Sequence, residues 1–376
     1  MKRTRLAGWM LMAMVLFALA GCGGQQATVS EQNESTPVNE NETAAGEQTA
    51  AEGSAATAGM SAEVAKIYEA AKQEGKVIYW SPDDASWVEA MARAFNEKYP
   101  GIEVESFEIQ PGPALERMIT EQGAGQTNVD VFNFYLTDVP TAMDKDLIAP
   151  YDWAGVFGIS PSNIAFDNHA LITWHLSHPI VYNTNLVKED EVPKSWEDLL
   201  DPKWKGNILL EARGNAFPIL SYKWGEEKTI EYLKSLLEQD PVLIKGGTPS
   251  TQAIVNGEAA IGIGPYAMRV EDLKAKGAPI EWAKVGPIAL ITETAGVLKE
   301  APHPNAALLW ASFMASPEGL KAREEAMYGG MLVGDHLSKI GQTMEENGIE
   351  RVVQSEDNLE LQKRMEQQVN AILSGL

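Results

Sequence analysis

Several polar side chains that can bind a small solute come directly after predicted strands. They are Ser81, Tyr135, Arg213, Asn215, Thr248, Ser250 and Tyr266. In open α/β sheets, ligands bind beyond the carboxyl ends of the strands, where helix N-termini present unpaired amides. We therefore expect these side chains to meet around one ligand-binding site.

The types of these side chains suit an anion or a metal ion. The planar guanidinium of Arg213 can bind a carboxylate or a phosphonate through two parallel hydrogen bonds, although an exposed surface arginine is the simpler alternative. The phenols of Tyr135 and Tyr266 can hydrogen-bond a solute or bind a ferric ion, and Tyr135 can equally be a core aromatic residue. The serine and threonine hydroxyls can instead cap nearby backbone.

The sequence offers little for catalysis. It has no Gly-x-Ser-x-Gly elbow, no His-Glu-x-x-His zinc helix, no Ser-x-x-Lys pair and no phosphate-binding Walker loop. His175 and His178 face opposite sides of an extended segment, so we interpret them as structural rather than metal-binding. We predict that the protein is not an enzyme and needs no cofactor, and we keep an extracellular hydrolase as the alternative from another class.

Short apolar strands alternate with amphipathic helices from Ser61 onward, a pattern typical of α/β sheets covered on both faces. The first half predicts helix 61–73, strand 77–80, helix 87–99, strand 102–109, helix 115–122 and strand 129–132. The second half predicts strands 208–210, 242–244 and 261–263, with helices from Ala216 and Thr251. We expect two α/β lobes, each with a mainly parallel sheet.

The N-terminus has the pattern of an export signal. Three basic residues precede the apolar stretch Leu6 to Ala20, which is too short to span a bilayer comfortably. The stretch runs into Leu19-Ala20-Gly21-Cys22, which resembles the lipobox of bacterial lipoproteins. The resemblance implies that residues 1–21 are a signal peptide and that Cys22 carries a lipid anchor at the bacterial cell membrane. An ordinary secretory signal with a chance cysteine is the alternative.

Composition separates a polar segment from an acidic body. Residues 23–60 contain no aromatic residue, Lys or Arg, so we interpret 22–60 as a lipidated cysteine and a disordered tether. That segment holds only six glutamates, so most of the net charge of -23 belongs to residues 61–376. Such a surface repels phosphate backbones, which argues against nucleic acid as a partner. Cys22 is the single cysteine, so an intrachain disulfide is excluded. We expect a monomer.

Blocks of sequence between residues 75 and 328 point to a family. The most specific is Val192-Pro-Lys-Ser-Trp-Glu-Asp-Leu-Leu-Asp-Pro-Lys-Trp-Lys-Gly206. The others, in order, are Gly75–Trp80, Phe95–Val104, Asn128–Phe132, Val181–Asn185, Val255–Ala259, Lys276–Pro279, His303–Ala306 and Ala315–Gly319. Together they resemble bacterial extracellular solute-binding proteins, and most of all the group of ferric-iron-binding proteins and their relatives for sugar phosphates and phosphonates.

The resemblance implies a type II periplasmic-binding-protein fold, in which two α/β lobes flank a ligand cleft and two strand crossings act as hinges. We place the crossings near 179–183 and 285–290. Lobe one would comprise 61–180 plus 285–330, and lobe two 181–284 plus 331–376. The implied function is that of a substrate-binding lipoprotein of an ABC importer, whose partners are a small-molecule solute, the permease and its ATPase. A ligand-presenting sensor lipoprotein is an alternative.

The chain departs from the ferric-iron pattern. Those relatives typically carry a Tyr-Tyr pair, whereas the corresponding stretch here has Tyr266 alone. They often carry a histidine in the first strand-helix loop, which has none in this chain. Asp83, Asp84 and the two tyrosines would form an incomplete set of anionic oxygens for Fe(III). We therefore favour a small organic or phosphorus-containing anion, with ferric iron bound by Tyr135 and Tyr266 as the alternative.

Overall fold

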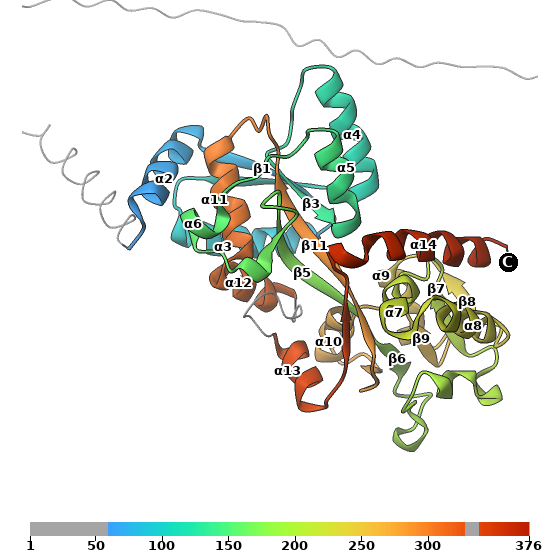
Figure 1. Cartoon of the computed structure of the whole chain (residues 1–376). Helices are drawn as coiled ribbons and strands as arrows, with labels where there is room; N and C mark the ends of the chain where they lie inside the picture. The colour runs from blue at the N-terminus through green and yellow to red at the C-terminus, as the bar shows by residue number, and fades with distance from the viewer. Residues whose placement is uncertain (1–58, 328–337, 376) are drawn as a thin grey trace, which may run out of the picture. The chain divides into compact units, whose positions relative to one another are not determined.

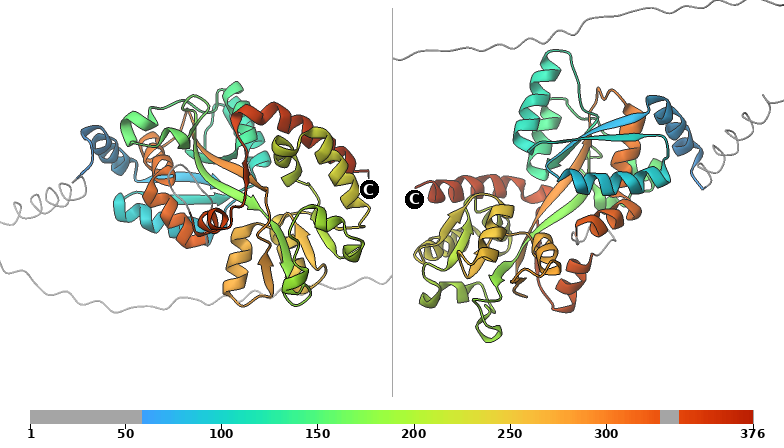
Figure 2. Two further views of the ribbon diagram at one scale, coloured as in Figure 1. Left: turned by 60° about the horizontal axis from the view of Figure 1, so that its bottom comes forward. Right: turned by 180° about the vertical axis from the view of Figure 1, so that it is seen from behind.

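The computed structural model describes residues 59–327 and 338–375, which form an α/β protein built on two β-sheets (Figures 1 and 2). The predicted signal peptide, Cys22 and nearly all of the predicted tether lie outside the described residues. Within the described part of the chain, no helix combines the length and the apolar character needed to cross a lipid bilayer.

The larger sheet runs in the order β2-β1-β3-β11-β5-β4, with β12 beside β11. Its strands are β1 Lys76–Ser81, β2 Glu103–Glu108, β3 Val131–Tyr135, β4 Ile164–Ala165, β5 Ala170–His178, β11 Ile288–Val297 and β12 Arg351–Val353. Strand β1 is parallel to β2 and β3, whereas β11 is antiparallel to β3 and β5. The sheet is therefore mixed, because β11, the strand that returns from the smaller sheet, runs opposite to its neighbours β3 and β5.

The larger sheet is covered on both faces because its strands are apolar on both faces. Along β1, Val77 and Tyr79 pack into one core with α2 (Ala62–Glu74), α3 (Ala85–Lys98) and α11 (Pro304–Ala315). Trp80 faces the opposite core, with α4 (Pro111–Gly123) and α5 (Val139–Asp144). Successive residues of a strand point to opposite faces, so this run needs helices on each side. Figure 1 shows α4 and α5 apart from α2 and α11 across the sheet.

The smaller sheet runs in the order β10-β6-β9-β7-β8. Its strands are β6 Ile180–Asn183, β7 Ile208–Glu211, β8 Val242–Ile244, β9 Ile261–Ile263 and β10 Ile280–Trp282. Ile208 and Leu210 pack toward α7 (Ala216–Trp224), α8 (Glu226–Leu237) and α14 (Leu359–Leu373), and Leu209 packs toward α9 (Gly247–Asn256) and α10 (Ala267–Ala275). The other α-helices of the described residues are α6 Trp153–Phe157, α12 Pro317–Met327 and α13 Lys339–Glu346.

The strands of the two sheets are joined at two places in the described chain. Strand β5 of the larger sheet leads through Pro179 into β6 of the smaller one, and β10 leads through residues 283–287 into β11. Both places fall where the sequence predicts crossings. The exact bounds of the two lobes stay a prediction.

One predicted strand is shifted. The expected strand 129–132 is observed as Val131–Tyr135, so Tyr135 ends the strand instead of following it. The added residues pair antiparallel with β11, where Tyr135 lies opposite Glu293. That partner strand is far away in the sequence, so the local pattern of residues 129–135 does not reveal the pairing.

Candidate functional site

A polar pocket of about 340 Å³ lies at the ends of strands from both sheets. The larger sheet contributes residues that follow β1 and β2, the end of β3, and side chains of β5 and β11. The smaller sheet contributes residues that follow β7, β8 and β9. The lining residues are Pro82, Asp83, Asp84, Trp87, Glu108, Gln110, Tyr135, Leu176, Arg213, Lys245, Gly246, Gly247, Thr248, Pro249, Tyr266, Met268, Arg269 and Glu293. Carboxyl ends of parallel strands are the usual place for ligands in such folds.

The pocket brings together four of the side chains that the sequence singles out. Tyr135, Arg213, Thr248 and Tyr266 all line it. They come from both sheets, and Tyr135 and Tyr266 are about a third of the chain apart in the sequence. Their meeting follows from one shared property, that each lies at or just after the carboxyl end of a strand.

Arg213 is fixed by a buried carboxylate behind it. Its Nε donates to Glu211 Oε1 at 2.8 Å, and its backbone amide donates to Glu211 Oε2 at 3.1 Å. The Gly246 amide also donates to Glu211 Oε1, at 2.8 Å. Glu211 is buried, whereas the Arg213 side chain is 37% exposed toward the pocket. The guanidinium is thus held in one place and presented to a ligand.

Tyr135 and Tyr266 are largely buried phenols. Burial raises the pKa of both, and the Arg213 charge opposes this rise only in part. Both phenols are therefore protonated near neutral pH and can donate a hydrogen bond to a ligand. The ring of Tyr266 occupies the space beside Gly247, where a Cβ atom would lie only 2.4 Å from ring atom Cε2.

The N-terminus of α9 opens onto the same pocket. Gly246 is the N-cap residue and has no side chain to satisfy the first amides of the helix. Gly247 and Thr248 follow as the first helical residues, and both line the pocket. Amides at these positions find no carbonyl partner inside the helix, and the helix dipole favours an anion there.

A buried acidic cluster forms the opposite part of the pocket. Arg323 Nη2 donates to Asp83 Oδ1 at 3.0 Å and to Glu293 Oε2 at 3.1 Å, and Asn133 Nδ2 donates to Glu293 Oε2 at 3.2 Å. The Arg323 guanidinium lies 4.7 Å from the ring centroid of Trp174. Burial, reinforced by the Asp83 charge, raises the pKa of Glu293 to about 7, and Arg323 opposes the rise.

An ion pair links the two sides of the pocket. Arg269 Nη2, on α10, lies 3.2 Å from Asp84 Oδ2, at the N-cap position of α3. The same guanidinium lies 4.9 Å from the ring centroid of Trp87. The pair is partly exposed, so its own contribution to the free energy of unfolding is small, about 1 kcal/mol or less.

Three predicted side chains do not line the pocket. The Ser81 hydroxyl accepts a hydrogen bond from the Asp83 amide at 3.2 Å, and the Ser250 hydroxyl donates to the Ile244 carbonyl at 3.2 Å. Both therefore have the backbone-capping role that was the alternative for them. Asn215 is the N-cap residue of α7 and makes no side-chain capping bond.

Sequence reasoning missed several lining residues and one residue behind them. Glu293 had an available signal, because it is a single acidic residue in the otherwise uncharged strand Ile288–Val297. Arg323 had none, because the surrounding Lys-Ala-Arg-Glu-Glu is typical of an exposed helix face. Lys245 and Arg269 were likewise missed, and Asp83 and Asp84 were considered only as iron ligands.

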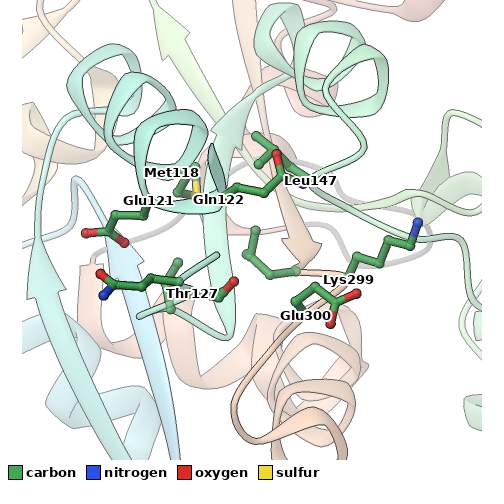
Figure 3. Close-up of a pocket in the computed structure, with 10 residues that line it drawn as sticks. Met118, Glu121, Gln122, Thr127, Leu147, Lys299 and Glu300 are labelled. Carbon is green, nitrogen blue, oxygen red and sulfur yellow. The ribbon is translucent and has the colours of Figure 1, made fainter. Parts of the chain in front are cut away.

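A second cavity between α4 and the end of β11 is too small for a solute (Figure 3). It is lined by Met118, Glu121, Gln122, Gln126, Thr127, Val129, Leu147, Leu298, Lys299 and Glu300. Its volume of about 10 Å³ is close to the minimum that holds one water molecule. Of these two cavities, the polar pocket is the better candidate for the binding site.

A sequence model of the family described as bacterial extracellular solute-binding protein matches residues 79–321. The chain belongs to this family. Its members are solute-binding proteins that act outside the cytoplasm, and the matched segment includes every lining residue of the polar pocket.

Among three curated relatives of this solute-binding protein, two have a ligand in their names, and the two ligands differ. An uncharacterized protein of Haemophilus influenzae is 27% identical over 60% of this chain and 68% of its own length. The major ferric iron-binding protein of Neisseria gonorrhoeae is 29% identical over 39% of this chain, and the match spans 47% of that relative. A putative 2-aminoethylphosphonate-binding periplasmic protein of Salmonella paratyphi A is 30% identical over 35% of this chain and 37% of its own length.

Solved structures show the type II periplasmic-binding-protein fold for this solute-binding protein. Iron-bound HitA from Pseudomonas aeruginosa superposes with a TM-score of 0.63 at 20% identity, covering 78% of this chain and 99% of that structure. AfuA from Actinobacillus pleuropneumoniae with fructose-6-phosphate has a TM-score of 0.62 at 20% identity. The match covers 80% of this chain and 99% of that structure. At such identities the likeness shows the fold and leaves the ligand open. The predicted fold is confirmed.

Proposed function

We propose that this chain is the substrate-binding lipoprotein of an ABC importer and that it captures a small organic or phosphorus-containing anion in the polar pocket. The observation that supports the anion most strongly is the convergence of Arg213 with the N-terminus of α9 on one pocket. A fixed guanidinium and unpaired helix amides are together a strong donor set for a carboxylate or phosphonate. The lobes would close over the solute and present it to the permease and its ATPase.

The test is a thermal-shift screen of metals, phosphonates, sulfonates, carboxylates and sugar phosphates, followed by titration of variants with the best ligand. A ligand at a hundredfold its dissociation constant adds about 2.7 kcal/mol to the free energy of unfolding. We expect Arg213→Ala to weaken binding by about 2–5 kcal/mol, mostly through faster release, because it leaves the charge of the ligand unpaired and desolvated.

Matched variants separate a direct role of Arg213 from damage to the fold. Arg213→Lys keeps a positive charge beside Glu211 but loses the planar fork, so we expect near-normal stability with weakened binding. Tyr135→Phe and Tyr266→Phe each remove one neutral hydrogen bond and should weaken binding by about 0.5–1.5 kcal/mol. An Arg213→Ala protein that folds and keeps full affinity for its anion would contradict the proposal.

Ferric iron is the second candidate, because Tyr135 and Tyr266 line the same pocket. Their raised pKa values mean that the metal would have to displace both phenolic protons, which makes iron binding pH-dependent. Within residues 59–327 and 338–375, no group of three or more His, Cys, Asp or Glu side chains is placed to hold a metal ion. Visible phenolate-to-iron colour that disappears in Tyr266→Phe, with Arg213→Ala unaffected, would favour iron.

The remaining alternatives differ in what happens after binding. A sensor lipoprotein would present its bound solute to a membrane signalling partner, and co-purification with a permease would exclude that role. A hydrolase would turn over an assayed ester or phosphate, whereas saturable binding without turnover supports transport. We also propose that the protein is monomeric, which size-exclusion chromatography with light scattering tests directly.

A further inference from the structure

In the polar pocket, the acidic and the basic residues come from different sheets. Its acidic residues all come from elements of the larger sheet: Asp83, Asp84, Glu108 and Glu293. Its basic residues all come from elements of the smaller sheet: Arg213, Lys245 and Arg269. A site for a simple anion needs the basic side alone, and the acidic side works against such a ligand.

The acidic side is a built structure and not a chance gathering of surface carboxylates. Asp83 and Glu293 are 7% and 4% exposed, and the fully buried Arg323 holds both through a single nitrogen, Nη2. Glu293 Oε2 accepts from Arg323 and Asn133, whereas Glu293 Oε1 accepts no hydrogen bond from any described residue. A buried carboxylate oxygen in a pocket wall is an acceptor for an N–H group of a ligand.

The size of the pocket lets one small solute reach both sides. The volume of about 340 Å³ lies at the lower end of the range of roughly 300–1,000 Å³ found for small-molecule sites. A compact molecule of that size has room for one charged group at each end. The ion pair between Arg269 and Asp84 shows that groups of the two sides already come within 3.2 Å of each other at one edge.

The net charge of the whole chain also favours a solute that carries no net negative charge. With a net charge of -23, the protein repels a purely anionic solute at long range. A solute that carries one positive and one negative group has no net charge and avoids this repulsion. The local charges of the pocket then orient it on arrival.

We propose that the solute is a zwitterion, with a protonated amine held by Asp83 and Glu293 and an anionic group held by Arg213 and the N-terminus of α9. This inference rests on the proposed function of the polar pocket as the solute site. It narrows the ligand from small anions in general to amino-carboxylates and amino-phosphonates.

Isothermal titration calorimetry of the purified protein with two matched pairs of compounds tests this inference. The pairs are 2-aminoethylphosphonate with ethylphosphonate, and β-alanine with propionate, which differ mainly by the amine. In at least one pair we expect the amino compound to bind about thirtyfold more tightly or better, the difference typical of a buried charge pair. Glu293→Gln should remove most of this difference, mainly by weakening the binding of the compound that carries the amine.

A matched control and the opposing outcomes complete the test. Glu97→Gln removes an exposed charge on α3, away from the pocket, and should leave all four affinities unchanged. Equal binding within both pairs, or no binding of any of the four compounds, overturns the zwitterion inference. If a different anion from the screen then binds, and Arg213→Ala binds it more weakly, the proposed function as an anion-binding protein holds and only the inference about the amine fails.

Discussion

At the scale of single residues, burial without a charged partner keeps two histidines neutral. His175 and His178 lie in the last part of β5, and burial lowers the pKa of each to about 4. His175 Nδ1 lies 3.1 Å from the Thr292 hydroxyl, and His178 Nδ1 lies 3.0 Å from the Gly264 carbonyl oxygen. These partners are neutral, so they do not compensate an imidazolium in the interior.

The first prediction is that His175 makes the protein sensitive to mild acid. In the unfolded chain, His175 is protonated below its ordinary pKa of about 6.5, whereas in the folded protein it is protonated only below about pH 4. Acid therefore lowers the free energy of unfolding. By pH 5 the loss is roughly 2 kcal/mol for this group. Urea unfolding at pH 7 and pH 5 measures the free energy of unfolding that is lost on acidification. In His175→Gln this loss should be smaller than in the parent protein by about 2 kcal/mol.

The comparison with the parent protein matters because Glu293 acts in the opposite sense. Its raised pKa means that the folded state binds a proton more readily than the unfolded state. As the pH falls from about 7 to the ordinary pKa of a glutamate, protonation of Glu293 therefore raises the free energy of unfolding. The two effects partly cancel in the pH profile of the parent protein. If His175→Gln and the parent lose equal stability on acidification, the prediction for His175 is wrong.

Local sequence was sufficient for the pocket residues that lie near strand ends. Tyr135, Arg213, Thr248 and Tyr266 could be nominated because a strand end is recognisable from the residues around it. Arg323 could not, because only the contact of α12 with Asp83 brings it to the pocket. Glu293 carried a signal as the single acidic residue of its strand, but its place in the pocket depends on the pairing of β11 with the distant β3.

At the scale of elements, the turn between β9 and α10 depends on a glycine. Gly264 has φ of +114°, and a Cβ atom there would lie 2.2 Å from the Cβ atom of Glu211. An L-residue is therefore strained at this position and also clashes with the carboxylate residue that holds Arg213. The turn, Glu211 and Arg213 form one connected support for the basic side of the pocket.

The second prediction follows from this turn. Gly264→Ala should lower the free energy of unfolding by about 3 kcal/mol or more and should weaken solute binding, because the shift of Glu211 displaces Arg213. Gly112→Ala, near the start of α4, is the matched control. No atom lies within 4 Å of an added Cβ there, and the helix gains up to about 1 kcal/mol. Chemical denaturation of both variants checks the contrast, and a near-neutral Gly264→Ala would refute it.

The elements were largely predictable because their boundaries carry local signals. Ser61 accepts a hydrogen bond from the Val64 amide and begins α2, and Gly75 ends it with φ of +76°. The shift of β3 and the mixed direction of both sheets were not predictable in this way. In the larger sheet both features depend on β11, which joins β3 and β5 only after the chain has crossed to the smaller sheet and returned. In the smaller sheet, the antiparallel pairs are those of β6 with β9 and β10.

At the scale of the whole molecule, the third prediction concerns the N-terminal segment. A protein that begins at Ser61 should fold as a soluble monomer and bind the solute with unchanged affinity. The reason is that the capping serine of α2, both sheets and the polar pocket all lie at or beyond that residue. Circular dichroism and titration measure this. If this protein is insoluble while one that begins at Gly23 folds, residues 23–60 contribute to the fold.

The fourth prediction concerns membrane attachment. Cys22 is the single cysteine, so Cys22→Ser disturbs no disulfide, and its effect reports on lipidation alone. We expect the variant to leave the membrane fraction and to take up no radiolabelled lipid. Stable anchoring generally takes two or more acyl chains, as a lipidated cysteine would carry. Full membrane retention with normal lipid uptake would show that another residue is the attachment point.

The stacking of Arg269 beside Trp87 gives the protein an optical property. The Trp87 indole lines the polar pocket, and its neighbouring guanidinium is 4.9 Å from the ring centroid. A solute that enters the pocket displaces water from this indole and disturbs its cationic neighbour, and both changes alter the emission of a tryptophan. Occupancy can therefore be followed by intrinsic fluorescence without any label. We expect Trp87→Phe to remove most of this fluorescence change, while the other tryptophans continue to report on the fold.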